Sequence, residues 1–333
     1  MRSCLSFFLG LNWGWLGCAS TSLRPFLILC CSFALPFATL WTQDARAQPL
    51  PTVRLEYRFE SGERMAMDVA HRALTETTIG STTQSTETAT DSTKLWSIVA
   101  VDPQGLITIE HSVIDVTMTS RTSDRGQVRW SSRGNEPPPP GYESVKQNLG
   151  VPLSRLVIDR TGRVIDRQDM RPNPPSNTGD LMIVPLPDGD VAVGAEWIVP
   201  QEVVVEVPDG PRKAVRTRLR YQLKEVRDHI AVIHVDTTVL TPLDDPRLEA
   251  RLLERIWDGT VKFDIQQGRV IHRTTGIDRR VVGFGGPDSS LHYKASLEEK
   301  ALMEEKALME EKALVKEKAL VKEKAIVTEK AQP

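Results

Sequence analysis

The stretch KLWSIVAVDPQGLITIEHSVIDVTM, residues 94–118, decides the fold class. Two apolar runs rich in β-branched residues flank Asp102-Pro103-Gln104-Gly105, which has proline at the second and glycine at the fourth position of a type I turn. This pattern predicts a β-hairpin. The apolar positions change parity after Val113, because Ile114, Val116 and Met118 are even-numbered whereas Ile107 and Ile109 are odd. The change predicts a β-bulge near residues 112–114.

The same two-residue period extends on both sides of this hairpin, from residue 50 to about residue 286. Val53, Leu55, Tyr57 and Phe59 alternate with charged residues, which is typical of a strand with one wet face. Further hairpin strands are expected in residues 155–167, 197–226, 229–240 and 260–278. Two short helices are expected, at 143–149 and at 246–254, the second with Asp245 as N-cap and Pro246 as its first residue.

These signals predict an all-β fold: a curved antiparallel sheet or half-barrel of hairpins, with one or two short helices and a long C-terminal charged helix. The threonine-rich stretch 75–93 is either solvent-facing strand or loop, because threonine favours strands but nearly every residue there is polar. The proline-rich stretches 136–140 and 171–179 are expected to form extended loops at the ends of the sheet.

The N-terminal 47 residues have the layout of a secretory signal peptide. An apolar run at 25–40 follows Arg24 and precedes the small-x-small site Ala45-Arg46-Ala47. The run is shorter than the roughly 20 residues that span a bilayer. We therefore expect cleavage after Ala47 and export to the periplasm or the extracellular space; the alternative is a membrane anchor formed by this segment.

The start of this leader is open. A second apolar stretch at 5–16 fits either a start codon nearer Arg24 or a degenerate lipidation site at Cys18. All four cysteines, Cys4, Cys18, Cys30 and Cys31, lie in the leader, so the mature chain has no disulfide.

The C-terminus is a hexapeptide repeat that begins at Lys294 with KASLEE and KALMEE. Its residues favour helix, and the sequence therefore divides into a β-domain at 48–290 and a helical tail at 291–333. Six residues advance about 600° around a helix, so the apolar pairs rotate from one repeat to the next and form no stripe. A coiled coil has a seven-residue period. We therefore expect a lone charged helix that packs little against the β-domain.

The sequence contains no convincing signature of catalysis or of cofactor or metal binding. The mature chain has no cysteine, and its six histidines lack the convergent spacing of a zinc site. No GxSxG elbow occurs, and Gly283-Phe284-Gly285-Gly286 lacks the Lys-Ser/Thr of a phosphate loop, so we interpret it as a strand exit. The near balance of 42 basic and 44 acidic residues argues against nucleic-acid binding.

Two motifs are more informative about packing. The first contains Val191, Val193, Gly194 and Trp197, and the second contains Gly259, Phe263, Asp264, Gly268 and Arg269. We expect Trp197 and Trp257 to bury their rings on the apolar face of the sheet, and Gly194, Gly259 and Gly268 to supply turns or bulges.

With the Ser61-Gly62-Glu63 turn and the turn at 102–105, these motifs resemble a family of exported all-β bacterial proteins of unknown function, abundant in planctomycetes. The resemblance covers about residues 53–282. It implies a curved antiparallel sheet similar to the half-barrels of periplasmic lipoprotein carriers, and it implies no catalytic residue. The threonine-rich stretch and the hexapeptide tail depart from the family pattern.

Two functions follow as hypotheses. The first is an exported non-enzymatic protein that binds an apolar or lipid-like ligand on the concave face of the sheet. The alternative is a structural or interaction protein of the cell envelope, in which the proline-rich loops, the threonine-rich stretch and the tail form a spacer. A continuous apolar cleft above about 300 Å³ favours the first. The sequence indicates no oligomeric state.

Overall fold

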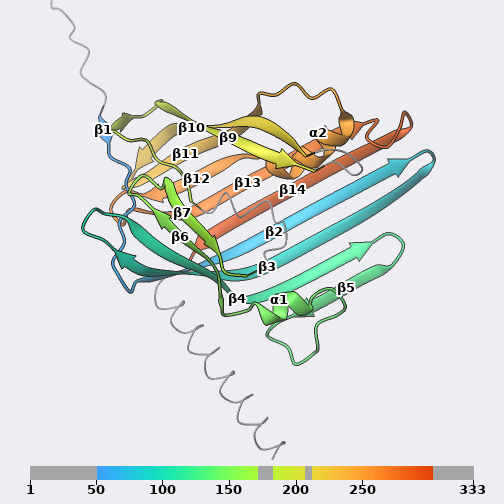
Figure 1. Cartoon of the computed structure of the whole chain (residues 1–333), viewed down its shortest axis with the longest axis horizontal. Coiled ribbons are helices and arrows are strands. Elements are labelled where there is room, and N and C mark those ends of the chain that lie inside the picture. The colour runs from blue at the N-terminus through green and yellow to red at the C-terminus, as the bar shows by residue number, and fades with distance from the viewer. Residues whose placement is uncertain (1–50, 172–182, 207–211, 303–333) are drawn as a thin grey trace, which may run out of the picture. The chain divides into compact units, whose positions relative to one another are not determined.

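The computed structural model describes residues 51–171, 183–206 and 212–302. Their backbone forms one antiparallel sheet of twelve strands that is not closed into a barrel, and a separate two-stranded sheet of β1 (Thr52–Val53) and β8 (Val191–Ala192) (Figure 1). The predicted all-β class, with its curved antiparallel sheet and two short helices, is confirmed.

The first half of the large sheet is built from hairpins. Its strands are β2 (Arg64–Ile79), β3 (Thr82–Val101), β4 (Ile107–Thr122), β5 (Gly126–Ser131), β6 (Pro152–Ile158) and β7 (Val164–Asp169). Strands β5 and β6 pair with different parts of β4, and α1 (Glu143–Gln147) lies between them in the chain. The turn at 102–105 joins β3 to β4 as predicted, closed by a hydrogen bond of 3.0 Å from Gly105 N to Asp102 O.

The second half is a meander. Its strands are β9 (Glu196–Val205), β10 (Lys213–Arg227), β11 (Ile230–Val239), β12 (Asp258–Asp264), β13 (Arg269–Val282) and β14 (Ser289–Ala301). Between β11 and β12 lie α2 (Pro246–Leu252) and a 3₁₀ turn, Leu253–Arg255. The two halves join where β14 pairs with β2, which gives the order β7-β6-β4-β3-β2-β14-β13-β12-β11-β10-β9.

Several local predictions are confirmed. Ile114 is the extra residue of a bulge, because Thr93 pairs with Asp115 while Lys94 pairs with Val113. The threonine-rich stretch 75–93 lies in β2 and β3, so of the two alternatives the strand is correct. The N-terminus of α2 is capped by Asp245, whose side chain accepts a hydrogen bond from Arg247 N.

The predicted tail helix is wrong in its first part. Residues 294–299, the first hexapeptide, belong to β14, so the β-domain extends beyond residue 290 to Ala301. Lysine, alanine, leucine and glutamate favour helix in isolation, but pairing with β2 and β13 on both sides outweighs that propensity. The remaining repeats, the leader at 1–47 and most of the proline-rich stretch 171–179 lie outside the described residues.

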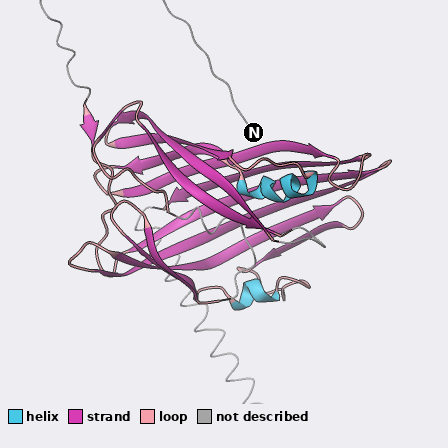
Figure 2. Cartoon of the chain, turned by 45° about the horizontal axis from the view of Figure 1, so that its top comes forward, coloured by secondary structure: helices cyan, strands magenta, loops and turns pink. Residues whose placement is uncertain are grey.

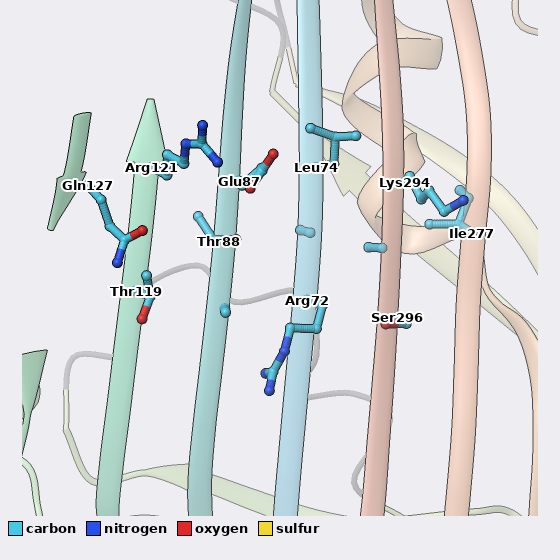
Figure 3. A pocket seen from close by; sticks show the side chains of 13 residues that line it. Arg72, Leu74, Glu87, Thr88, Thr119, Arg121, Gln127, Ile277, Lys294 and Ser296 are labelled. Carbon is cyan, nitrogen blue, oxygen red and sulfur yellow. The ribbon is translucent and has the colours of Figure 1, made fainter. Parts of the chain in front are cut away.

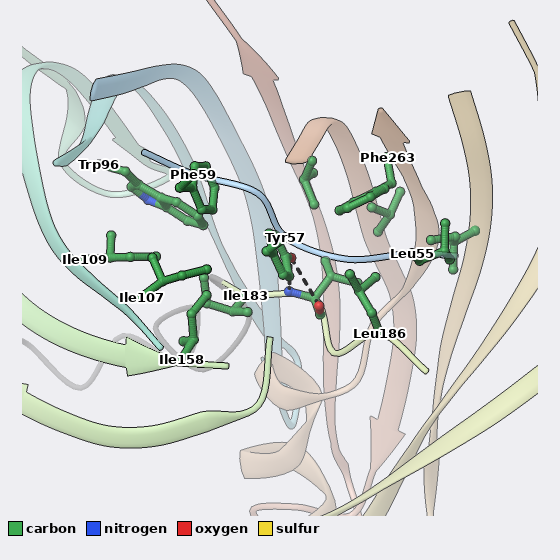
Figure 4. Close-up of a cluster of buried hydrophobic side chains, with 14 of the residues drawn as sticks. Leu55, Tyr57, Phe59, Trp96, Ile107, Ile109, Ile158, Ile183, Leu186 and Phe263 are labelled. Atoms are coloured by element: carbon green, nitrogen blue, oxygen red, sulfur yellow. Dashed lines mark hydrogen bonds between the residues drawn. The ribbon is translucent and has the colours of Figure 1, made fainter. Parts of the chain in front are cut away.

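The hydrophobic core lies on one face of the sheet, which we call the inner face. The two wings of the sheet turn this face toward each other across the segment 55–59, which runs between them (Figure 4). Tyr57 is at the centre of this core: its hydroxyl group donates to Val184 O and accepts from Val184 N, each at 3.1 Å. The opposite, outer face carries mainly charged and polar side chains, such as Arg72 and Asp91.

The two helices cover separate flanks of the inner face. Leu253 and Trp257, which follow α2, pack on Val281, Tyr293 and Ala295 of β13 and β14. On the other flank, the loop before α1 packs on Trp130 of β5, whose ring centroid is 6.3 Å from that of Tyr142. Figure 2 shows the central strands running between these flanks.

Candidate functional site

Three charged side chains meet on the inner face and form what we call the ion cluster: Lys94, Arg273 and Glu299. Lys94 Nζ donates to Glu299 Oε1 over 2.8 Å, and Arg273 Nη2 donates to Glu299 Oε2. The exposed fractions of their side chains are 16% for Lys94 and 5% for each of the other two. Charged groups are rarely buried to this degree unless they are paired or serve a function.

The strand register explains why these residues meet. Arg273 of β13 is directly opposite Glu299 of β14, and both side chains point to the inner face. Val69 of β2 is opposite Glu299 on the other side and opposite Ser92 of β3. Lys94 is therefore one inner-face position further along β3, and its long side chain reaches diagonally across β2.

The charges of the cluster do not cancel. Burial alone would raise the pKa of Glu299, but the charges of Arg273 and Lys94 and their hydrogen bonds lower it to about 2. His111 of β4 is directly opposite Trp96, which is two residues along β3 from Lys94. Burial, followed by the charge of Lys94, lowers the pKa of His111 to about 3. With a neutral His111, one carboxylate faces two cations, and the cluster has a net charge of +1 near neutral pH.

Four buried polar atoms around the cluster have no hydrogen-bond partner among the described residues: Arg273 Nε, Thr275 Oγ1, Trp96 Nε1 and His111 Nε2. All four side chains belong to residues that are less than 10% exposed. Most such atoms in proteins are satisfied, because an unpaired buried group costs about 1–3 kcal/mol. Arginine Nε and tryptophan Nε1 can only donate, and a threonine hydroxyl can do so, so the surplus is one of donors.

Next to the cluster, part of the inner face carries small side chains. We call it the inner strip; it consists of His71, Ala73 and Thr75 of β2 and Thr88, Thr90 and Ser92 of β3. These residues are half-buried. Ala73 packs against the cluster that contains Leu253 and Trp257, so the α2 flank borders the strip on the β2 side.

The residues that the sequence singled out for packing surround the core rather than the strip. Phe263 is fully buried, and its ring meets that of Tyr57 edge-on at a centroid distance of 5.5 Å. Asp264 Oδ1 accepts from Gln267 N at 2.8 Å and so shapes the turn before Gly268. Gly268 has a φ of +64°, and its carbonyl accepts from Arg58 N at 2.9 Å. This hairpin therefore holds the segment 55–59 in the core.

Gly259 and the two tryptophans have different environments. A Cβ atom on Gly259 would lie 2.1 Å from Thr274 O, so β12 and β13 can approach only because this residue is glycine. Trp257 is buried as expected. Trp197 is only half-buried: it stacks on Tyr221 at 5.5 Å and donates from Nε1 to Pro185 O at 2.9 Å. Gly194, three residues before it, has a φ of +92° and lies in a turn.

The sequence did not predict the ion cluster. Lys94 and Arg273 looked like ordinary strand residues, and Glu299 was assigned to the tail helix. The available signal was parity: Tyr293, Ala295 and Leu297 alternate with Lys294, Ser296 and Glu298, and Glu299 is the next position of the apolar parity.

Grooves occur on the outer face. They have volumes of about 390, 400 and 650 Å³, and charged side chains such as Arg72 and Lys294 interrupt a lining that also contains apolar residues such as Ile277 (Figure 3). Several of these charges pair with one another, such as Arg72 with Asp91 at 2.5 Å and Lys294 with Asp278 at 3.2 Å. These grooves lack the continuous apolar lining that would favour a lipid-like ligand.

Two further properties concern the described residues alone. Within ranges 51–171, 183–206 and 212–302, no group of three or more histidine, cysteine, aspartate or glutamate side chains is arranged to hold a metal ion. The helices in those ranges are all too short or too polar to cross a membrane.

Comparisons with known proteins give no family. No protein-family model matches the chain, and no curated protein matches it. Among solved structures, lipovitellin matches 74% of this chain and 26% of its own, with 11% identity and a TM-score of 0.43. DynF from the dynemicin pathway of Micromonospora chersina (6% identity, TM-score 0.19) covers 78% of this chain and 89% of its own. The translocator domain of the autotransporter NalP from Neisseria meningitidis (9%, 0.21) covers 73% and 89%.

Proposed function

We propose that this is an exported, non-catalytic protein that binds an amphipathic ligand with an acyl chain along the inner strip. The observation that carries the proposal is the inner strip itself: a row of half-buried and mostly small side chains on the core-bearing face, bordered on one side by the cluster of Leu253 and Trp257, against which Ala73 packs, and on the other by Trp130 and Tyr142. A ligand site in a curved sheet is expected on this face.

The width of the inner strip fits one chain-like molecule. From β14 to β4 there are three inter-strand steps, each of about 4.8 Å, which together give roughly 14 Å. Alanine, serine and threonine keep the floor low, and the methyl groups of threonine offer apolar contact. The hydroxyl groups would hydrogen-bond any polar part of the ligand, which is why we propose an amphipathic molecule rather than a hydrocarbon.

The alternative role as an envelope spacer was based on three segments: the proline-rich loops, the threonine-rich stretch and the tail. One of the three does not fit this role. The threonine-rich stretch, which was to be part of an extended spacer, is the centre of the sheet in β2 and β3. Its backbone is paired on both sides, with β14 and β4, and it cannot extend without breaking the sheet.

The experiment is a titration of the exported protein with dodecan-1-ol and with dodecanoic acid, followed by isothermal calorimetry and native mass spectrometry. We expect one ligand per chain for at least one of the two. Thr90→Trp fills the middle of the inner strip and should abolish binding, because the indole occupies the place of the acyl chain.

Ala89→Trp is the matched control. Ala89 is the preceding residue of β3, and its side chain points to the outer face. Binding should survive in this variant. If neither dodecyl compound binds the unmodified protein, or if both tryptophan variants lose binding equally, the proposal is wrong.

A further inference from the structure

We infer that the ion cluster of Lys94, Arg273 and Glu299 receives a carboxylate, so that the ligand class is a long-chain carboxylic acid. This inference rests on the proposed function, since it places the head of the same ligand at the end of the inner strip. It assigns a role to a cluster that the packing of the sheet alone does not require.

The net charge of the ion cluster favours a carboxylate. The cluster carries two cations against one carboxylate, and all three side chains are largely buried. An uncompensated buried charge is unfavourable, and a monoanion placed beside it restores neutrality. A carboxylate supplies this single negative charge. A phosphate monoester has a charge of about −1.5 to −2 at pH 7 and would leave the site negative.

The unpaired hydrogen-bond donors around the cluster also favour a carboxylate. Arg273 Nε, Thr275 Oγ1 and Trp96 Nε1 are buried donors without an acceptor among the described residues. The two oxygens of a carboxylate offer about four lone-pair sites and accept from several donors at once. A neutral alcohol has one oxygen and no charge, so it satisfies fewer of these groups.

The ion cluster lies at one end of the inner strip. Ser92, an end residue of the inner strip, is the next inner-face residue of β3 after Lys94. Thr275 is separated from His71 of the strip only by Leu297, because β13, β14 and β2 pair in this order. A chain lying on the strip therefore has its end beside the cluster, and Lys94, the most exposed of the three charged residues, is at the point of entry.

The closing experiment compares dodecanoic acid with dodecan-1-ol on the full exported chain at pH 8, where the acid is ionised. A hydrogen bond to a charged group is worth about tenfold to a hundredfold in affinity, so the acid should bind at least about tenfold more tightly. Equal affinities would overturn the headgroup inference and leave the proposed function standing. Binding of neither compound would overturn the proposed function itself.

Lys94→Met removes one charge, keeps an unbranched side chain that is one heavy atom shorter, and leaves the Arg273–Glu299 pair neutral. We expect the preference for the acid to fall to about onefold while the affinity for dodecan-1-ol stays the same. Lys300→Met is the control, because Lys300 is an exposed residue of β14 that points to the outer face. Its preference for the acid should be unchanged.

A second variant decides the question if Lys94→Met does not fold. Thr275→Val keeps the shape of the side chain and removes only a hydroxyl group that has no partner in the described structure. It should lower the affinity for the acid about threefold to tenfold and leave dodecan-1-ol unaffected. If the acid keeps its full preference in Thr275→Val or in a folded Lys94→Met protein, the cluster is not the carboxylate site.

Discussion

His111 should make this protein sensitive to mild acid. An unfolded histidine takes up a proton near pH 6.5, whereas burial lowers the pKa of the folded His111 to about 3. Between these two values the unfolded state binds the additional proton, so the free energy of unfolding decreases as the pH is lowered. Burial, followed by the charge of Lys94, opposes uptake of the proton by the imidazole in the folded protein.

The size of the effect follows from the shift in pKa. Each unit corresponds to about 1.4 kcal/mol, and the unfolded histidine is already half protonated at pH 6.5, so a change from pH 6.5 to 4.5 should remove about 2 kcal/mol of stability through this residue. Glu299 acts in a different range, since its lowered pKa contributes stability that is lost only as the pH falls from about 4.5 toward about 2.

The assay is urea unfolding by circular dichroism at pH 7.0, 6.0, 5.0 and 4.5, for the unmodified protein and for His111→Leu. Leucine cannot titrate, and the substitution removes no hydrogen bond that His111 makes within the described residues. The free energy of unfolding of the variant should depend less on pH, by a slope that approaches about 1.4 kcal/mol per pH unit below about pH 5.5.

A residual slope is expected in the variant and belongs to other groups. Burial, followed by the charges of Arg72 and Lys94, also lowers the pKa of His71, which therefore acts in the same direction. Hydrogen bonds to Asp278 and Glu76 raise the pKa of the half-buried His292, which acts in the opposite direction. Because these groups are common to both proteins, equal slopes for the two would refute the reasoning about His111.

Three further predictions concern the fold. Phe263→Ala should destabilise the protein by about 3–5 kcal/mol in urea unfolding, and Trp197→Ala by clearly less, since Trp197 is half-buried; the reverse order would show that the core is misplaced. Gly259→Ala should cost about 2–3 kcal/mol because its Cβ would collide with backbone, whereas Gly134→Ala, with its nearest contact at 3.5 Å, should change little. A chain that ends at residue 293 should show no cooperative unfolding, because it lacks residues 294–301 of β14. A chain that ends at residue 302 should retain cooperative unfolding. Identical transitions in the two chains would mean that β14 is not a core strand.

The sequence predicts most of the sheet because its local signals agree. Turn residues at 102–105 and the parity change at Ile114 are short-range features, and the structure has the hairpin and the bulge where they indicate. The capping signal at Asp245 is equally local. In each case the residues that determine the structure are within a few positions of one another.

The ion cluster could not be found in this way. Its three members come from β3, β13 and β14, and the pairing of β14 with β2 is what brings them together. No residue near Glu299 in the sequence reveals this pairing, and the helix propensity of the repeat points away from it. The tertiary contacts overrule the local preference, and the site is created by those same contacts.

The seam between β2 and β14 also has a consequence for the order of folding. Lys94 and Glu299, which are hydrogen-bonded across this seam, are 205 residues apart in the chain. Closing so long a loop is entropically costly, and topologies with such distant contacts fold slowly. The hairpins of each half can form early, but the two halves cannot join until the last strand has been synthesised. A chain that reaches its final compartment by threading through a translocon therefore remains open until its C-terminal strand has passed, and pulse-labelling hydrogen exchange during refolding should find β2 and β14 protected last.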